Sequence, residues 1–92
     1  MQYTKGQAKK AIFVAANTMQ DIYLDEDKDR SLDAPAREIH GTLGELWVYL
    51  WEWMEGNDNT QVQPNMNANI CKALSQAGRI TEKYMQEQRD RY

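Results

Sequence analysis

Apolar residues recur at intervals of three and four along most of the chain, which is the spacing that places side chains on one face of an α-helix. The first such series consists of Ile12, Ala15, Ala16, Met19, Ile22 and Tyr23. Thr4 precedes this series and can accept a hydrogen bond at a helix N-terminus. We therefore predict a first helix over residues 5–24.

A second apolar series occupies the middle of the chain and consists of Ala36, Ile39, Leu43, Leu46, Leu50 and Trp53. Its alternating spacing of three and four residues is typical of the contact seam in a left-handed helical bundle. Asp33 is a candidate N-cap, and Pro35 suits the first turn, where its missing N–H group is not needed. Gly56-Asn57 is a common signal for a helix C-terminus. We predict a second helix over residues 34–55.

A third apolar series consists of Ile70, Ala73, Leu74, Ala77, Ile80 and Tyr84. It predicts a helix over residues 67–89, whereas residues 57–66 lack periodicity and are expected to form a loop. Residues 25–33 form a charged connector. Because no alternating strand pattern is present, we predict a single all-α domain over residues 1–92, a small three-helix bundle with a long central second helix.

The second half of the predicted second helix is unusually apolar. Beside its seam it adds Trp47, Trp51 and Met54, so that with Trp53 of the seam it carries all three tryptophans of the chain. Two neighbouring helices cannot easily cover so many directions. Gly41 and Gly44 lie in the same helix, where each costs roughly 1 kcal/mol relative to alanine. They would permit close approach of another backbone, within the monomer or across a homodimer, and a ligand pocket is a third alternative. We expect self-association through these six residues.

Composition narrows the classes of partner. The 92-residue chain has a formal net charge of -3, which argues against general nucleic-acid binding. Its single cysteine, Cys71, excludes an internal disulfide and a multi-cysteine zinc site, and it suits a reducing compartment. We recognise no signal peptide and no apolar stretch of the about 20 residues that a membrane span needs. We therefore expect a cytoplasmic protein without a membrane segment.

The charged connector superficially matches a calcium-binding EF-hand loop, because acidic residues occupy its first, third, fifth and ninth positions. Arg30 stands where the loop needs a glycine, and Ala36 stands where it needs a bidentate glutamate. Lys28 also places a positive charge inside the proposed site. We therefore expect a solvated acidic loop that binds no metal.

Two other short patterns suggest catalysis. Glu52-Trp53-Met54-Glu55 and Glu87-Gln88-Arg89-Asp90 resemble fragments of the magnesium-binding pattern of the MazG-related all-α nucleotide pyrophosphohydrolases. The paired glutamates of that pattern are absent. His40 has no acidic residue three or four positions away that could orient its imidazole. We expect no enzymatic activity, no catalytic residue and no cofactor.

Basic residues form two lines that could bind an anion, and they comprise Lys5, Lys9, Lys72, Arg79 and Lys83. Both lines could instead face the acidic stripe Glu38-Glu45-Glu52 and form exposed ion pairs, worth only about 0–1 kcal/mol each. Lysines in the first turn of a helix oppose its dipole. The start of the first helix is therefore where we would look first for an anion.

These patterns favour a non-catalytic protein–protein interaction module, a small cytoplasmic adaptor or inhibitor that occupies the surface of a partner protein, acting as a homodimer. The sequence does not identify the partner. The alternative is a small-molecule or nucleotide-binding protein, with a pocket between the basic face of the third helix and an aromatic wall. Its extreme form would be a magnesium-dependent nucleotide hydrolase.

Overall fold

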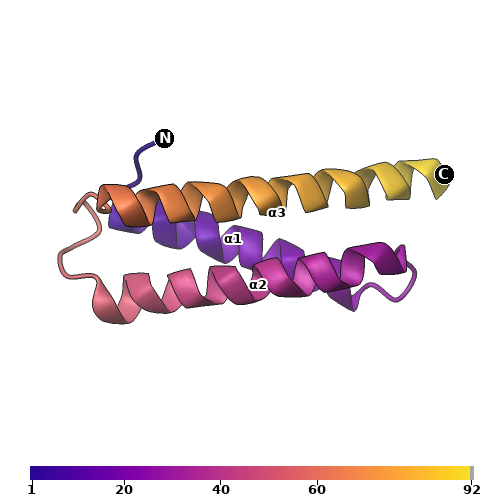
Figure 1. Ribbon diagram of the computed structural model, residues 1–92, viewed down its shortest axis with the longest axis horizontal. Helices are drawn as coiled ribbons and strands as arrows, with labels where there is room; N and C mark the ends of the chain where they lie inside the picture. The colour runs from indigo at the N-terminus through magenta and orange to yellow at the C-terminus, as the bar shows by residue number, and fades with distance from the viewer. Residues whose placement is uncertain (92) are drawn as a thin grey trace.

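The computed structural model describes residues 1–91, which fold into three long helices (Figure 1). The elements are α1 (Lys5–Leu24), the 3-10 turn η1 (Arg30–Leu32), α2 (Asp33–Val48), the π-helical turn η2 (Tyr49–Trp53) and α3 (Pro64–Arg91). Apart from one isolated bridge between Thr4 and Gln61, this part of the chain contains no β-structure. The predicted all-α three-helix bundle is confirmed. No helix within residues 1–91 is both long and apolar enough to cross a bilayer.

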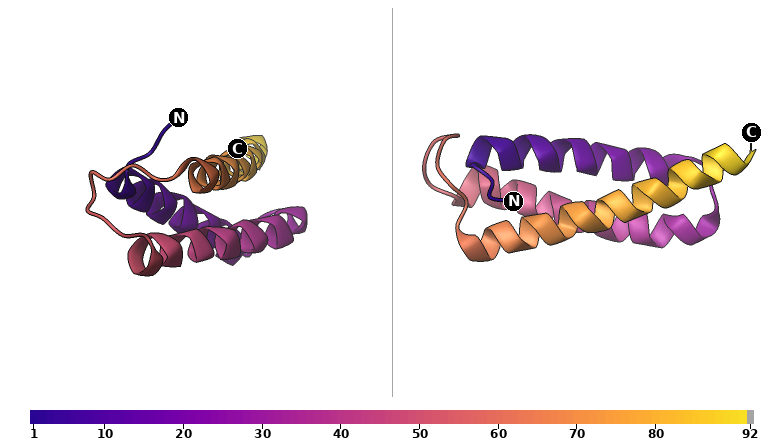
Figure 2. Two further views of the ribbon diagram at one scale, coloured as in Figure 1. Left: turned by 60° about the vertical axis from the view of Figure 1, so that its left-hand side comes forward. Right: turned by 90° about the horizontal axis from the view of Figure 1, so that it is seen from above.

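The molecule is elongated, with principal extents of 46 × 21 × 17 Å. α1 and α2 form an antiparallel pair, and α3 crosses this pair obliquely, as the two views of Figure 2 show. All three helices contribute to one apolar core. Its largest fully buried side chains belong to Ile12, Met19, Ile22, Leu43, Leu50, Val62 and Ile70.

α1 covers the predicted range because side chains satisfy both of its ends. At its start, the Thr4 hydroxyl accepts the Gln7 N–H at 3.2 Å, and the Gln7 side-chain oxygen accepts the Thr4 N–H at 3.0 Å. This reciprocal pair is a capping box. At its end, the Lys28 ammonium donates to the carbonyl oxygens of Tyr23 and Asp25, both at 3.1 Å. The lysine that counted against a calcium site therefore stabilises a helix C-terminus.

The start of α2 differs from the prediction that Asp33 is the N-cap. Leu32 occupies that position and makes no side-chain cap hydrogen bond. The reason is that η1, which is capped by Asp29, leads directly into α2. Asp33 lies in the first turn, and its carboxylate pairs with Lys28 at 3.1 Å and with Arg37 at 3.0 Å.

The end of the second helix also differs from prediction, because α-helical bonding gives way to a π turn. The Met54 N–H donates to the Tyr49 carbonyl at 2.8 Å, a bond that spans five residues instead of four. The wider turn rotates the side chains that follow it. Trp53, predicted to lie in the seam, is 72% exposed, whereas Met54 packs against the core. The helix ends at Trp53, before the predicted residue 55.

The third helix is the longest of the three. It begins at Pro64, where the missing N–H is not needed, and runs past the predicted end to Arg91. The N-terminal segment is tied to this end of the bundle, because the Tyr3 N–H donates to the side chain of buried Asn67 at 2.9 Å. The Val62 N–H donates back to the Tyr3 carbonyl at 3.0 Å.

Candidate interaction surface

Aromatic side chains gather along the outer groove between α1 and α2. We call this surface the aromatic face and define it by Phe13, Gly44, Trp47, Val48 and Trp51. The antiparallel pairing of the helices brings the Phe13 ring to 5.6 Å from the Trp47 ring, and the Trp47 and Trp51 rings are 5.4 Å apart. Trp47 is half-buried against the core. Phe13 and Trp51 remain 52% and 55% exposed.

A hollow of about 250 Å³ opens in the aromatic face. Its lining consists of Ile12, Phe13, Ala16, Asn17, Gly44 and Trp47. Only Asn17 contributes a polar side chain to this lining. Two small residues from different helices, Ala16 on α1 and Gly44 on α2, are part of this lining and leave the space between them open.

Gly41 and Gly44 do not serve helix packing inside the monomer. A Cβ atom added at either position would meet no atom of residues 1–91 within 4 Å, apart from the helix's own neighbouring backbone. Two of the explanations that the sequence offered for these glycines therefore remain, a contact with another molecule and a ligand pocket. The close approach of backbones occurs instead at Gly6, where a Cβ would lie 3.0 Å from that of Asp58.

Both lysines of α1 that were predicted to bind an anion have partners within the chain. The Lys5 ammonium donates to the carbonyl oxygens of Met54 at 2.7 Å and Gly56 at 3.1 Å, just beyond the C-terminus of η2. The Lys9 ammonium pairs with Asp58 at 2.8 Å and lies 3.9 Å from the centre of the Trp51 ring. A lysine that opposes the dipole of its own helix thus stabilises the end of the antiparallel neighbour.

The three basic residues of α3 lie on a different surface. Lys72 lines a hollow of about 470 Å³ between α2 and α3 together with Glu45. Arg79 and Lys83 line a second one, of about 280 Å³, together with Glu38. Across residues 1–91, none of the three forms an ion pair within 4 Å. The expected exposed pairs with the acidic stripe are therefore absent from this part of the chain.

The sequence suggested a pocket between the basic face of the third helix and an aromatic wall. Within residues 1–91, the basic residues and Trp47 line separate hollows. The hollow that contains Trp47 lies between α1 and α2, whereas those lined by the basic residues lie between α2 and α3. Among the described residues that line the hollows with the basic set, Tyr49 is the aromatic one, and it shares its hollow with Lys72. The two predicted halves of a nucleotide site thus lie in different grooves of the bundle.

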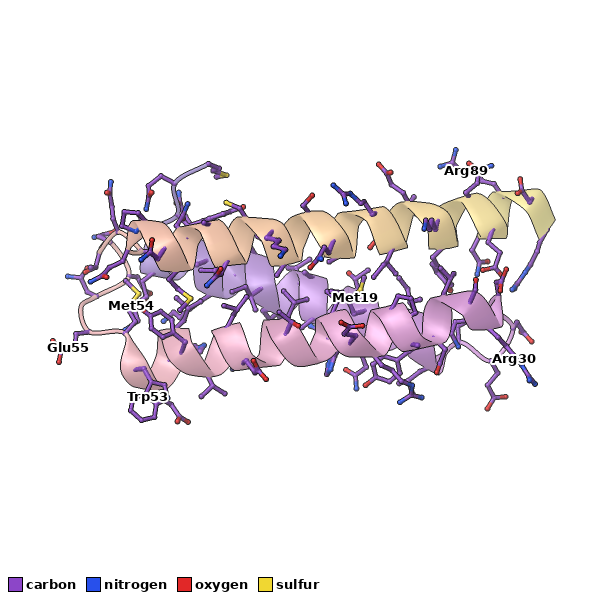
Figure 3. All side chains as sticks on the ribbon, in the orientation of Figure 1. Met19, Arg30, Trp53, Met54, Glu55 and Arg89 are labelled. Carbon is purple, nitrogen blue, oxygen red and sulfur yellow. The ribbon has the colours of Figure 1, made fainter. Side chains whose placement is uncertain are left out.

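The acidic fragments that resemble a hydrolase pattern lie at opposite ends of the bundle. Figure 3 shows Glu55 beside Trp53 and Met54 at one end and Arg89 at the other. No three His, Cys, Asp or Glu side chains within residues 1–91 are grouped so that they could hold a metal ion. His40 packs against Tyr23, with the ring centres 5.5 Å apart and the planes nearly perpendicular. The two acidic fragments therefore do not form one site with each other or with His40 in the described residues.

The acidic connector is held by hydrogen bonds to the end of α3. The Tyr84 hydroxyl donates to the Asp25 carboxylate at 2.6 Å, and the Gln88 amide donates to the same oxygen at 3.2 Å. The Asp29 N–H donates to the Glu87 carboxylate at 2.6 Å. The Tyr84 bond, together with the Asp27 backbone N–H, lowers the pKa of Asp25, and the same Asp25 bond and burial raise the pKa of Tyr84. The carboxylates of Asp25 and Glu87 therefore attach the connector to α3.

These shifts predict how the stability of the protein depends on pH. The pKa values of Asp25, Asp29 and Asp33 in the folded protein are all lowered from 3.8. The stabilisation that their ionised carboxylates provide is therefore present above pH 3.8 and is lost as the pH falls through the pKa values of the folded protein. The pKa of Tyr84 is raised from 10.0, so its stabilisation is lost as pH rises above 10.0. Urea denaturation from about pH 6 to about pH 2 should show the free energy of unfolding falling as the pH is lowered. In Asp25→Asn this fall with pH should be less steep. If the pH dependence of unfolding in Asp25→Asn equalled that of wild type below about pH 4, the stabilising role given to the Asp25 carboxylate would be wrong.

The chain matches no protein-family model, no curated protein and no solved structure. Functional inference therefore depends on its own residues.

Proposed function

We propose that the protein is a non-catalytic interaction module that binds another protein through the aromatic face. The observation that carries the proposal is the exposure of Phe13 and Trp51, each more than half in solvent, beside an apolar hollow. Contiguous exposed apolar surface marks interaction sites, and aromatic side chains dominate the energetics of protein interfaces. The chain would act as a small cytoplasmic adaptor or inhibitor by occupying the surface of its partner.

Two further features support a binding role. Trp51 lies within the π turn η2, and turns of this kind are frequent at functional sites. The open backbone at Gly44 retains a roughly 1 kcal/mol cost relative to alanine that no contact in the described residues explains. A contact surface for a second molecule accounts for both the exposed aromatic rings and the glycine.

Affinity capture with matched variants tests the proposal. Trp51→Glu places a charge in the aromatic face, whereas Trp53→Glu makes the same change at a tryptophan that is 72% exposed and points away from the bundle (Figure 3). We expect a protein recovered by wild type and by Trp53→Glu to be lost with Trp51→Glu, since a buried charge at an interface costs several kcal/mol. Circular dichroism should show equal helicity in both variants. Equal recovery by both variants would contradict the proposal.

Small-molecule or nucleotide binding remains the alternative prediction, at Lys72, Arg79 and Lys83 in the grooves between α2 and α3. Calorimetric titration of nucleotides with and without magnesium tests it separately. Binding that is lost with Arg79→Glu and retained by Trp51→Glu would favour this alternative over the aromatic face.

A further inference from the structure

We propose that the molecule that occupies the aromatic face is a second copy of this chain, placed antiparallel about a two-fold axis. In this arrangement Trp51 of each copy enters the hollow beside Gly44 of the other. The inference rests on the proposed function in one respect, namely that the aromatic face is a contact surface. It adds the identity of the partner and the geometry of the contact.

The aromatic face is complementary to itself. Gly44 and Trp51 lie on the same face, because the Trp51 ring is 5.4 Å from the Trp47 ring, which lines the hollow together with Gly44. They are separated by roughly 10 Å along the axis of α2 and η2. A two-fold axis perpendicular to α2 near residues 47 and 48 exchanges these two positions. Each exposed indole then meets a hollow, and the contact occurs twice. An isologous interface of this kind follows from one self-complementary patch.

The hollow can accept an aromatic ring. Its volume is about 250 Å³, whereas a cavity of about 150 Å³ in a protein interior holds a benzene molecule. A Cβ at Gly44 would meet no atom of the described residues within 4 Å, so a side chain from outside can lie directly against the backbone there. The surrounding Ile12, Phe13 and Trp47 provide apolar contacts.

The charges at the two ends of α2 and η2 favour the antiparallel orientation. Arg37, whose side chain is 57% exposed and pairs with Asp33, lies near the start of α2. Exposed Glu52 and Glu55 lie in and just after η2, where Lys5 and Lys9 of α1 also approach. An antiparallel pair places each guanidinium near the acidic end of the other copy, whereas a parallel pair would place like charges together. Complementary charges of this kind set the orientation more than the affinity of a complex.

The available area predicts a weak dimer. Aromatic side chains bury about 150–250 Å² each, so the exposed parts of Phe13, Val48 and Trp51, with the edge of Trp47, supply roughly 300 Å² of apolar surface per copy. At about 60% apolar content, the whole contact covers roughly 1,000 Å² over both copies, below the standard size of about 1,600 Å². We therefore expect dissociation in the micromolar range.

Sedimentation equilibrium of the full chain between about 2 and 200 µM tests the dimer, a range that brackets a micromolar dissociation constant. Wild type should change from monomer to dimer across this range. Trp51→Glu and Gly44→Gln should each raise the dissociation constant at least about tenfold, because one buries a charge and the other fills the hollow. A Cβ at Gly44 meets no atom of the described residues within 4 Å, and glutamine is a better helix former than glycine. At a protein concentration where wild type is monomeric, the melting temperature of Gly44→Gln should therefore not fall.

Two variants serve as matched controls. Gly78→Gln fills another open glycine, in the middle of α3, and Trp53→Glu charges the tryptophan outside the aromatic face. Both should keep the wild-type dissociation constant within about threefold, as expected of substitutions away from the contact. A loss of dimer in the controls equal to that in Gly44→Gln would overturn the assignment to this face.

Cross-linking tests the orientation. In a Cys71→Ser background, Val48→Cys lies next to the two-fold axis and should be joined to its copy by a short dithiol-reactive linker. Arg37→Cys should not be joined, because its copies would be roughly 30 Å apart along the helix axis. Joining of both variants would indicate a parallel pair, and failure to join Val48→Cys would place the axis elsewhere; either result would overturn the arrangement.

The outcomes separate this inference from the proposed function. A wild type that remains monomeric at about 200 µM, well above a micromolar constant, overturns the dimer. If such a monomer still captures a protein that Trp51→Glu loses, only this inference fails. A dimer that both Trp51→Glu and Gly44→Gln leave intact overturns the aromatic face as the dimer contact.

Discussion

Replacement of Leu50 by alanine should lower the free energy of unfolding by about 2–5 kcal/mol, the range for a fully buried leucine. Leu50 is 0% exposed and is the last buried position of the seam, where α2 passes into the π turn. Leu50 belongs to the same apolar core against which the half-buried Trp47 and Met54 pack. Urea denaturation monitored by circular dichroism measures the change.

Leu24→Ala provides the matched control, because it removes the same atoms from a leucine that is 60% exposed. Its expected effect is below about 0.5 kcal/mol, as for ordinary surface substitutions. Leucine and alanine have similar helix propensities, so local helix stability contributes little to the comparison. Similar losses in the two variants would mean that Leu50 is not in the core.

The sequence predicted α1 and the seam of α2 well because local signals and tertiary packing agree there. The capping residues of α1 lie within four residues of its start, and Ile39, Leu43 and Leu50 are buried as their spacing requires. The π turn was not predictable in this way. Local spacing does not show the contacts that this end of the helix makes with other segments, such as the hydrogen bond from the Lys5 ammonium to the Met54 carbonyl.

The candidate site was predicted in part. Trp47 and Trp51 were recognised, and Trp53 was placed in the seam because α-helical spacing was assumed throughout. Phe13 was missed because it lies on another helix. A signal for it exists, since Phe13 and Val14 are large apolar residues that lie off the buried stripe of α1, and both are more than half exposed. The hollow could not be predicted, because Ala16 and Gly44 come to line it only through the pairing of α1 with α2.

Asn67→Ala should lower the free energy of unfolding by about 1–3 kcal/mol, the cost of leaving buried polar groups without partners. Asn67 is the one buried polar residue within residues 1–91, at 8% exposure. Its side-chain oxygen accepts the Tyr3 N–H at 2.9 Å, and its amide donates to the Met1 carbonyl at 2.7 Å. Alanine removes both bonds at once, and the 3.4 Å hydrogen bond from the Cys71 thiol to the Met1 carbonyl remains as a link between the segment before α1 and α3.

Asn69→Ala is the control, because it makes the same change two residues further along α3 at an exposed position. It should leave stability unchanged or raise it slightly, since alanine is the better helix former. Hydrogen exchange adds a local measurement: in Asn67→Ala the Tyr3 amide should lose protection, whereas amides in the middle of α1 should exchange at rates set by the global change alone. Retained protection at Tyr3 would show that Val62 and the neighbouring backbone hold the N-terminal segment without Asn67.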